Sequence, residues 1–409
     1  MTKKFNVASL FSGCGGMDLG FEGGFSVPIE SIDRQLYKNI TIGKNKFIKL
    51  NELNFKTVFA CDVNFKAKVA WENYFSSRRN VKNIFHHKSI VDIVKDIKSG
   101  DLKNLNDIDV VTGGFPCNDF SVAGKRLGFN SNKSHKGNGT LIDGASEDAS
   151  AENRGMLYYW MREFIGLTKP NIFYAENVKG LISLGDAKEI IAKDFSTVNN
   201  ENYFVLPVRV LKAIEYGVPQ TRERVIFIGI NLKKLKPKIR TYIQKNGELP
   251  EELDLYPKST HGNDVGLIPI VNCRAAFRGL AEPEASLDLS HQAYSKAKYM
   301  GKMQGQSEIL LDKPGPTIRA EHHGNIEFRR LGNELGGKNV KELDAGLEQR
   351  RLSVRECARI QTFPDDFEFV KNQLLSGSDG YRLIGNAVPP LLAFHLAARL
   401  EKIWHEIFI

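Results

Sequence analysis

The chain has 409 residues, 42% of them hydrophobic and 26% charged, a composition typical of a globular protein with one large and one smaller domain. No apolar run is long enough to cross a membrane, and the apolar stretch at the N-terminus is too short for a secretion signal, so we expect a cytoplasmic protein. The five cysteines lack Cys-x-x-Cys spacing, which argues against a disulfide framework and against a bound metal. The net charge of +9 favours a polyanionic partner.

The first half of the chain alternates strand-like and helix-like segments. Buried strands are predicted in four places, residues 7–11, 57–62, 108–111 and 172–175. A helix is predicted from 64 to 75, and the alternation as a whole is typical of a parallel sheet covered by helices. Two further strands, 203–211 and 224–230, have too few residues between them for a crossover helix, which predicts an antiparallel pair at the sheet edge.

The second half of the chain is less regular. Between about 231 and 350, glycine, proline and polar residues are frequent and no helical period is strong, which predicts a separate loop-rich domain. Helices are predicted again at 351–361 and at 389–409, and the second of these is amphipathic. Two connections, 26–56 and 130–153, are longer than a strand–helix unit needs, and we interpret them as insertions.

Two strand ends carry groups that suit catalysis. Cys117 follows the strand at 108–111 through a glycine-rich turn, an arrangement that can present a nucleophile at the edge of a parallel sheet. Glu176 follows the next strand, at 172–175. A thiol and a carboxylate at the ends of neighbouring strands can face one substrate, although an isolated cysteine is more often a buried core residue.

The first strand ends in a glycine-rich turn that opens a helix, a place where a cofactor can bind. Gly13 and Gly15 match the start of the dinucleotide fingerprint, but Asp18 replaces its third glycine, which argues against a nicotinamide-dependent dehydrogenase. Asp62, at the end of the second strand, has two interpretations. It can accept hydrogen bonds from ribose hydroxyls, or it can cap the following helix.

Six sequence blocks follow one another along nearly the whole chain. They are Leu10-Phe11-Ser12-Gly13-Cys14-Gly15-Gly16, Gly114-Phe115-Pro116-Cys117, Glu176-Asn177-Val178, Gln220-Thr221-Arg222-Glu223-Arg224, Arg351-Leu352-Ser353-Val354-Arg355-Glu356 and Gly385-Asn386-Ala387-Val388-Pro389-Pro390. In these blocks and their order the chain resembles the DNA (cytosine-5)-methyltransferases of bacterial restriction-modification systems. The resemblance implies an α/β fold, the Rossmann-like mixed sheet of S-adenosylmethionine-dependent methyltransferases with helices on both faces. It further implies a catalytic and cofactor-binding domain formed by 1–230 and 381–409, and a smaller loop-rich target-recognition domain and hinge at 231–380.

The resemblance also implies a reaction, the transfer of a methyl group from S-adenosylmethionine to C5 of a cytosine that is flipped out of a specific double-stranded DNA sequence. Cys117 would add to C6 of the base as a thiolate, and Glu176 would hydrogen-bond to N3 and the exocyclic amine. Arg224 would hold the carbonyl oxygen of the cytosine, and Arg222 would lie toward the nucleophile and a phosphate. For these two arginines the alternative is ion pairing at the surface.

The resemblance assigns binding residues as well. The cofactor set is Phe11, Gly13, Cys14, Gly16, Asp62, Val63, Ser89, Ile90, Pro116, Leu157, Asn386 and Val388. Phe11 would stack on the adenine, whereas Ser89 stands where the family usually has an acid, so that contact lacks a charge. The DNA-binding set is Ser121, Thr317 and Arg319, of which Arg319 would read a guanine edge or a phosphate. The insertion at 130–153 either contacts DNA or is an inert surface excursion.

The resemblance implies double-stranded DNA as the partner and no contact with a membrane. We expect a monomer, because one copy of the chain is sufficient for the chemistry. A cognate restriction endonuclease that acts on the same site is compatible with it. One alternative is a tRNA cytosine-5 methyltransferase, whose Cys-Phe-Thr signature is missing because Arg274 follows Cys273. The other is a non-catalytic DNA-binding relative, against which the intact Cys117 and Glu176 argue.

Overall fold

A computed structural model describes residues 4–34, 41–103, 105, 107–116, 156–198, 201–301, 303–320 and 326–409. Within these residues the main sheet has the strand order β6 (Phe85–His86), β5 (Phe55–Cys61), β1 (Phe5–Leu10), β7 (Val110–Gly114), β8 (Ile172–Val178), β12 (Glu223–Asn231), β10 (Glu201–Val205) and β9 (Thr197–Val198), with β11 (Arg209–Lys212) also paired to β12. Strands β6, β5, β1, β7 and β8 run parallel to one another, so their carboxyl ends meet at one edge of the sheet. This confirms the parallel sheet predicted for the first half.

The antiparallel part of the sheet differs in detail from the expectation. β12 runs antiparallel to β8 on one side and to both β10 and β11 on the other. The run at 203–211, predicted as one strand, is therefore two strands that pair with different halves of β12. Pro207 lies between them, and it has no N–H group to donate to a continuous ladder.

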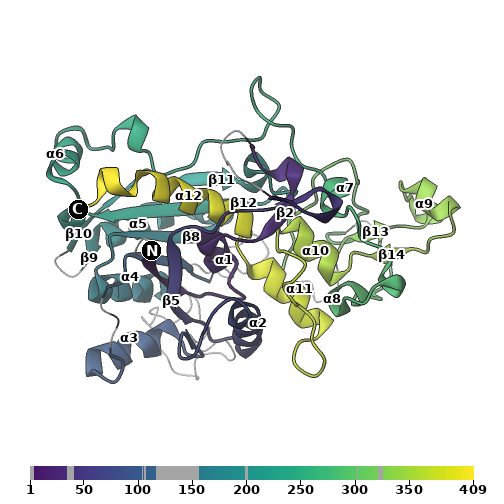
Figure 1. The fold of residues 1–409 in the computed structure, drawn as a ribbon, viewed down its shortest axis with the longest axis horizontal. Coiled ribbons are helices and arrows are strands. Elements are labelled where there is room, and N and C mark those ends of the chain that lie inside the picture. Colours follow the sequence, from purple (N-terminus) through teal and green to yellow (C-terminus); the bar gives the residue numbers. More distant parts are fainter. Residues whose placement is uncertain are drawn as a thin grey trace.

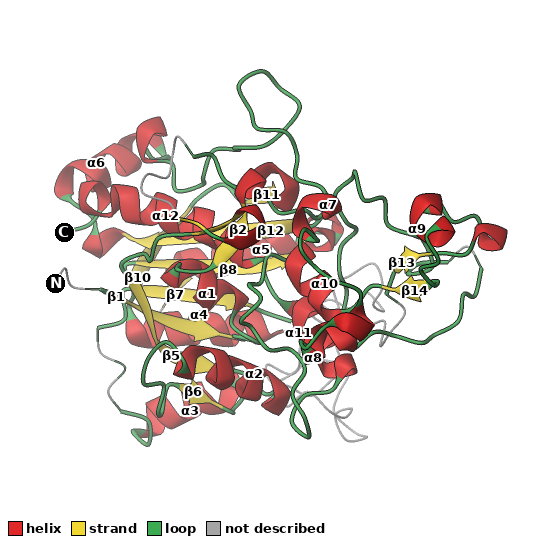
Figure 2. Cartoon of the chain, turned by 45° about the vertical axis from the view of Figure 1, so that its right-hand side comes forward, coloured by secondary structure: helices red, strands yellow, loops and turns green. Residues whose placement is uncertain are grey.

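Helices cover both faces of the sheet, as predicted (Figures 1 and 2). One core cluster joins α1 (Gly16–Glu22), α2 (Phe65–Ser76) and α12 (Pro390–Ile407) to one face, and the other joins α3 (Ile90–Ser99), α4 (Leu157–Thr168) and α5 (Ala187–Ser196) to the opposite face. Successive strand residues alternate between the clusters, since Val7 belongs to the first and Ala8 to the second. Most strand side chains are therefore buried whichever face of the sheet they point to, which explains why the sequences of these strands are continuous apolar runs.

The last helix returns to the first, as the cofactor interpretation required. Gly20 of α1 lies so close to α12 that an added Cβ would be 2.4 Å from the Ala393 Cβ and 2.5 Å from the Pro390 carbonyl oxygen. The segment Gly377–Ile407, which holds α11 (Gly377–Asn386) and α12, has the length and apolar composition of a membrane-crossing helix, but 83% of its most apolar part is buried inside the protein. That burial is typical of a core helix.

Two ten-residue helices in the second half, α6 (Pro237–Asn246) and α11, were not predicted. α6 lies next to the C-terminus, where the Lys236 N–H donates to the Ile407 carbonyl oxygen at 2.9 Å (Figure 1). The sequence between 231 and 350, where no helical period is strong, did not indicate α6, because α6 buries only Ile239 and Ile243, and two apolar residues in a lysine-rich sequence give a weak period.

The remaining elements are short and joined by long loops, as predicted. They are a small sheet in the first insertion, β2 (Ser26–Pro28), β4 (Phe47–Lys49) and β3 (Thr41–Ile42), followed by α7 (Cys273–Ala276), α8 (Leu289–Gln292), the pair β13 (Phe328–Arg330) and β14 (Arg350–Arg351), α9 (Val340–Asp344) and α10 (Val354–Ile360). Ion pairs replace part of the apolar core here. Arg350 donates to both carboxylate oxygens of Glu356, at 2.7 and 2.9 Å, and Glu282 accepts from Arg330 at 2.6 Å. These arginines lower the pKa of Glu282 to about 2, although its partial burial opposes the shift.

Three distant segments meet around one buried arginine. Arg222 is 1% exposed, and its guanidinium donates to the carbonyl oxygens of Ile318 at 3.1 Å and of Gly385 at 3.0 Å. An added Cβ on Gly385 would lie 2.4 Å from the backbone nitrogen of Ala320, so only glycine fits there. This junction of Arg222, residues 318–320 and Gly385 fixes the loop at 317–319 against the end of the sheet.

We expect Gly385→Ala to destabilise the protein by about 1–3 kcal/mol, because the added methyl group must displace backbone atoms. Gly377→Ala in the same helix is the control, since its Cβ would make an ordinary 3.4 Å contact with the Ala293 Cβ and alanine is the better helix former. Urea unfolding of the two variants measures the difference. Equal stability would show that the junction is not tight.

A carboxyl group is buried beneath the first glycine turn. Asp18 is 1% exposed, and the Ser9 hydroxyl donates to its Oδ2 at 3.0 Å. Burial, assisted by the neighbouring charge of Glu22, raises the pKa of Asp18 from 3.8 to about 7. The folded protein therefore holds a proton on this group in a pH range where the unfolded chain has lost it.

The stability of the protein should respond to this proton. Between pH 4 and 7 the folded state binds more protons at Asp18 than the unfolded state, so the contribution of Asp18 to the free energy of unfolding should fall as pH rises, by up to about 1.4 kcal/mol per pH unit. The buried His395, whose pKa is lowered to about 3, contributes in the opposite direction, so the effect of Asp18 is the difference between the parent and an Asp18 variant. Asp18→Asn keeps an acceptor for Ser9 and cannot titrate, so its stability should lack this fall. Denaturant unfolding at several pH values measures the difference, and parallel curves would contradict the assignment.

Candidate active site

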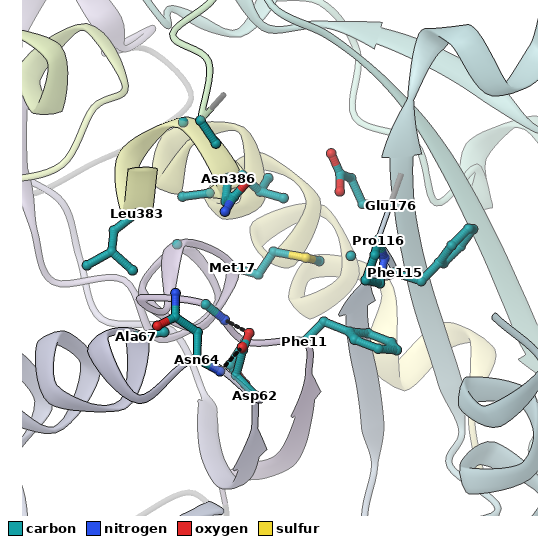
Figure 3. A pocket seen from close by; sticks show the side chains of 18 of the residues that line it. Phe11, Met17, Asp62, Asn64, Ala67, Phe115, Pro116, Glu176, Leu383 and Asn386 are labelled. Carbon is teal, nitrogen blue, oxygen red and sulfur yellow. Dashed lines mark hydrogen bonds between the residues drawn. The ribbon is translucent and has the colours of Figure 1, made fainter. Parts of the chain in front are cut away.

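A cavity of about 1040 Å³ opens at the carboxyl edge of the parallel strands. The ends of β1, β5, β7 and β8 and the start of β12, with residues 221 and 222 before it, line the cavity from the sheet. Residues 317–320 and 385–388 also line it. Figure 3 shows Asp62 and Asn64 toward one end and Glu176 and Pro116 toward the other. The volume exceeds what one drug-sized ligand needs, so two ligands can lie in it together.

Glu176 and Arg224 form an ion pair at one end of this cavity. Arg224 Nε lies 2.6 Å from Glu176 Oε1, and each side chain is only about a tenth exposed. Glu176 comes from the end of β8, beside Gly114 of β7 in the parallel register. An added Cβ on Gly114 would be 2.8 Å from Glu176 Oε2, so the glycine makes room for the carboxylate. Because both side chains are nearly buried, the ion pair of Arg224 does not lie on the protein surface, and that alternative was wrong for Arg224.

Arg222 is buried as well, so for it too the alternative of a surface ion pair was wrong. It lines the cavity, and the carbonyl oxygens of Ile318 and Gly385 accept hydrogen bonds from its guanidinium. Its orientation toward a phosphate remains a prediction.

Cys117 and Ser121, like the insertion at 130–153, lie outside the residues that the structure describes. Pro116, directly before Cys117, lines the cavity. The four described cysteines are buried, and burial raises the pKa of each thiol (Cys14, Cys61, Cys273 and Cys357). Within the described part of the chain, therefore, no cysteine is a ready source of thiolate.

The glycine turn after β1 has a conformation that side chains rarely allow. Gly13 and Gly15 have φ values of 54° and 90°. An added Cβ on Gly16 would lie 2.3 Å from the Val388 carbonyl oxygen, so the C-terminal segment packs directly on the turn. Phe11 also has a positive φ, 52°, a strained conformation that is typical of functional sites. The turn therefore sets both the direction of Phe11 and the position of Val388 at the cavity.

Asp62 is held in place by two backbone groups. Its carboxylate accepts hydrogen bonds from the Gly13 N–H at 2.9 Å and the Asn64 N–H at 2.8 Å (Figure 3). Burial raises the pKa of Asp62. The helix-cap interpretation of Asp62 was wrong, because the Asn64 side chain caps α2 by accepting from the Lys66 N–H.

Most of the predicted binding residues lie around this one cavity. The lining includes Phe11, Gly13, Gly16, Asp62, Val63, Ser89, Ile90, Pro116, Leu157, Thr317, Arg319, Asn386 and Val388. Cys14 is not among the lining residues, and its thiol points to the Leu383 carbonyl oxygen at 3.6 Å. Ser89 accepts from the Val91 N–H at 3.2 Å and so caps α3. Arg319, which the resemblance assigns to the DNA-binding set, lies 3.6 Å from Glu327.

The sequence did not point to several other lining residues. Asn64 directly follows the Asp62 turn, and a polar residue before a helix was a signal that could have found it. Gln304 lies in a loop without any periodic pattern, so nothing local marked it. Among the described residues, no group of three or more His, Cys, Asp or Glu side chains is placed to hold a metal ion.

The lining fits S-adenosylmethionine at the end that Phe11 and Asp62 form. A carboxylate fixed by backbone N–H groups can accept from ribose hydroxyls, and an aromatic ring beside it can stack on a purine. The open glycine turn allows the cofactor to approach the backbone, because a Cβ on Gly13 would have no atom within 4 Å. The other end, with Glu176 and Arg224, remains available for a second ligand.

Comparisons with known proteins agree with this geometry. The family model of the C-5 cytosine-specific DNA methylases matches residues 5–402. The chain is 32% identical to the Type II methyltransferase M.BsuRI of Bacillus subtilis, over 98% of this chain and 80% of that protein, and 32% identical to M.BspRI of Lysinibacillus sphaericus, over 98% and 82%.

Solved structures are similar in fold. The Dnmt2 methyltransferase of S. pombe has a TM-score of 0.57 at 15% identity, covering 98% of this chain and 99% of that one. The methyltransferase EhMeth of Entamoeba histolytica has a TM-score of 0.55 at 15% identity, covering 98% and 99%. Since the family model spans nearly the whole chain, this protein belongs to the C-5 cytosine-specific DNA methylases, which use S-adenosylmethionine.

Proposed function

We propose that this chain methylates C5 of a cytosine within a specific double-stranded DNA sequence, as the modification enzyme of a restriction-modification system. The observation that carries the proposal is the buried Glu176–Arg224 pair, which lies in the same cavity as the glycine turn and Asp62. A methyl donor and a base can thus bind together at one sheet edge. The Type II methyltransferases among its relatives support the biological setting.

The bound cofactor supplies an electrophilic methyl group, and the protein must make C5 of the base nucleophilic. Cys117 follows the cavity-lining Pro116, and its thiolate would add to C6 of the cytosine, which places electron density on C5. After C5 has taken the methyl group, loss of the C5 proton and departure of the thiolate restore the ring. Phe11 and Asp62 would hold the adenosine, and the nearby Ser89 would add an uncharged contact.

Glu176 and Arg224 would recognise the polar edge of the base. Arg224 Nε pairs with Oε1 of Glu176, whereas Oε2 lies close to Gly114, two residues before the cavity-lining Pro116. Oε2 is therefore the oxygen available for N3 and the exocyclic amine. The remaining N–H groups of Arg224 suit the carbonyl oxygen of the cytosine.

A base within a duplex cannot reach the ends of buried strands, so the target cytosine must leave the helix. The protein carries a net charge of +9, which favours binding of the DNA backbone. Thr317 and Arg319 line the cavity from the recognition side and would contact DNA around the flipped base. We place the enzyme in the cytoplasm as a monomer, with a restriction endonuclease of the same site as its partner.

Cys117→Ser should lower the rate of methyl transfer at least about 10³-fold, because a hydroxyl is far less nucleophilic than a thiolate. The measurement is incorporation of labelled methyl groups from S-adenosylmethionine into duplex DNA, with bisulfite sequencing to locate them. The parent and a control, Cys273→Ala, should form a covalent adduct with a duplex that contains 5-fluorocytosine at the target, and Cys117→Ser should not. Methylation by Cys117→Ser at the parental rate would refute the covalent mechanism.

Glu176→Gln should lower kcat about 10²- to 10³-fold and leave the affinity for S-adenosylmethionine nearly unchanged, since the carboxylate acts on the base rather than on the cofactor. Asp312→Asn is a suitable control because it removes an exposed ion pair with Arg274, whose side chain is 61% exposed. Steady-state kinetics and cofactor titration separate the two effects. A variant with normal kcat would exclude Glu176 from catalysis.

A further inference from the structure

A buried acid lies directly behind the wall of the cavity. Asp18 of α1 is 1% exposed, and its Oδ2 accepts a hydrogen bond at 3.0 Å from the hydroxyl of Ser9, which itself lines the cavity. Met17, the residue before Asp18, also lines the cavity, and Figure 3 shows it between Asp62 and Glu176. The Asp18 carboxyl group is therefore close to the middle of the cavity, between the end suited to adenosine and the end with Glu176.

The two buried acids of α1 differ in their partners. Glu22, one turn after Asp18, forms an ion pair with Arg79 and accepts from the Thr57 N–H at 3.0 Å. Among the residues that the structure describes, no cation pairs with Asp18, and its buried Oδ1 has no hydrogen-bond partner within bonding distance. A buried carboxylate is costly unless a positive charge comes near it. The fold thus supplies a cation for Glu22 and leaves the charge of Asp18 uncompensated.

The methyl donor and its product differ in charge. S-adenosylmethionine is a sulfonium with a net charge of about +1, whereas S-adenosylhomocysteine is a neutral thioether. The sulfur has to lie between the ribose at Asp62 and the base at Glu176, a placement that rests on the proposed function. A positive charge within about 10 Å through a protein interior lowers the pKa of a carboxyl group by about 1. An ionised Asp18 therefore attracts the donor and not the product.

We propose that Asp18 is a specificity-determining residue for the cofactor, because its ionised carboxyl group favours binding of S-adenosylmethionine over S-adenosylhomocysteine. When the donor binds to the protonated enzyme, Asp18 releases its proton to solvent, so the proton leaves as the sulfonium charge arrives. After methyl transfer Asp18 faces a neutral thioether and takes up a proton again. The product then loses this part of the attraction, which favours its exchange for a new donor.

The groups around Asp18 set the pH at which it ionises. Burial raises the pKa of Asp18 to about 7, the charge of Glu22 adds to the shift, and the hydroxyl groups of Ser9 and Thr57 oppose it. Where α12 packs on Gly20 of α1, its contacts come from uncharged residues. The other titratable groups that interact with Asp18, with Glu22 or with the neighbouring thiols are Cys14, Cys61, Asp62, Tyr74 and Arg79.

Calorimetric titration of the full chain with each ligand between pH 5.5 and 7.5 tests the proposal. In the parent, the Kd for S-adenosylhomocysteine divided by the Kd for S-adenosylmethionine should rise up to about 10-fold over this range. Near pH 6.5, binding of the donor should release about half a proton, measured in two buffers of different ionisation enthalpy. Sinefungin, which has a charged amine in place of the methylated sulfur, should behave like the donor.

Asp18→Asn keeps an acceptor for Ser9 and cannot ionise, so its Kd ratio should stay nearly constant with pH and it should release no proton. Comparison with this variant also removes the ionisation of the ligands themselves. Asp312→Asn, which removes a carboxylate that is 75% exposed, is the matched control and should behave like the parent.

Ser9→Ala provides a second measurement that does not require Asp18→Asn to fold. Without the Ser9 hydroxyl the charged form of Asp18 is less stable, so the rise of the Kd ratio should move to higher pH. A ratio that rises equally in the parent and in Asp18→Asn would overturn the inference and assign the proton to another group, such as Asp62.

A constant ratio in the parent would overturn the inference as well, and since no DNA is present in these titrations the proposed function would stand. A parent chain that binds the donor as predicted but methylates no duplex would overturn the proposed function and not the role of Asp18.

Discussion

The site depends on the burial of the Arg222 charge. A guanidinium can leave water only if acceptors surround it, and here two of the acceptors are the main-chain carbonyl oxygens of Ile318 and Gly385. Side chains two residues apart lie on the same side of an extended chain, so fixing Arg222 also fixes Arg224 on the side that faces Glu176. One buried charge therefore connects the recognition segment, the last helices and the pair that would bind the base.

Residues from both ends of the chain form the cavity, and they pack closely because glycines, which have no side chain, stand at the points of contact. Gly16 and Gly20 allow the segment around Val388 and the start of α12 to lie directly on α1, and Gly114 gives the same room to Glu176. Since these contacts join residues far apart in sequence, the cavity is completed only when the C-terminal helices dock. Formation of the cavity is thus tied to the folding of the whole chain.

Much of the fold, and the site residues that lie at strand ends, could be predicted from the local pattern of apolar and polar residues. Apolar runs that end in a polar residue predicted the parallel strands. Because the carboxyl ends of parallel strands meet at one edge of the sheet, they also predicted that Asp62 and Glu176 lie at the same edge. Local pattern fails where the deciding contact is distant: Arg222 bonds to carbonyl groups 96 and 163 residues away, and main-chain acceptors leave no trace in sequence. It fails also for α6, whose two buried isoleucines give too weak a period. The six sequence blocks, in the order found in the family, identified site residues such as Arg222, Arg224 and Asn386 that no periodic pattern indicated.

Two buried arginines, Arg222 and Arg351, hold neighbouring loops through main-chain carbonyl groups. Arg351 donates to the carbonyl oxygens of Ala297 and Gly305, as Arg222 donates to that of Ile318, and none of these contacts involves a side chain of the loop that is held. A loop that side-chain packing held in place would lose its shape whenever its contact residues changed. Here the side chains of these loops can change while the carbonyl groups remain, so the same buried arginines can hold loops of different sequence.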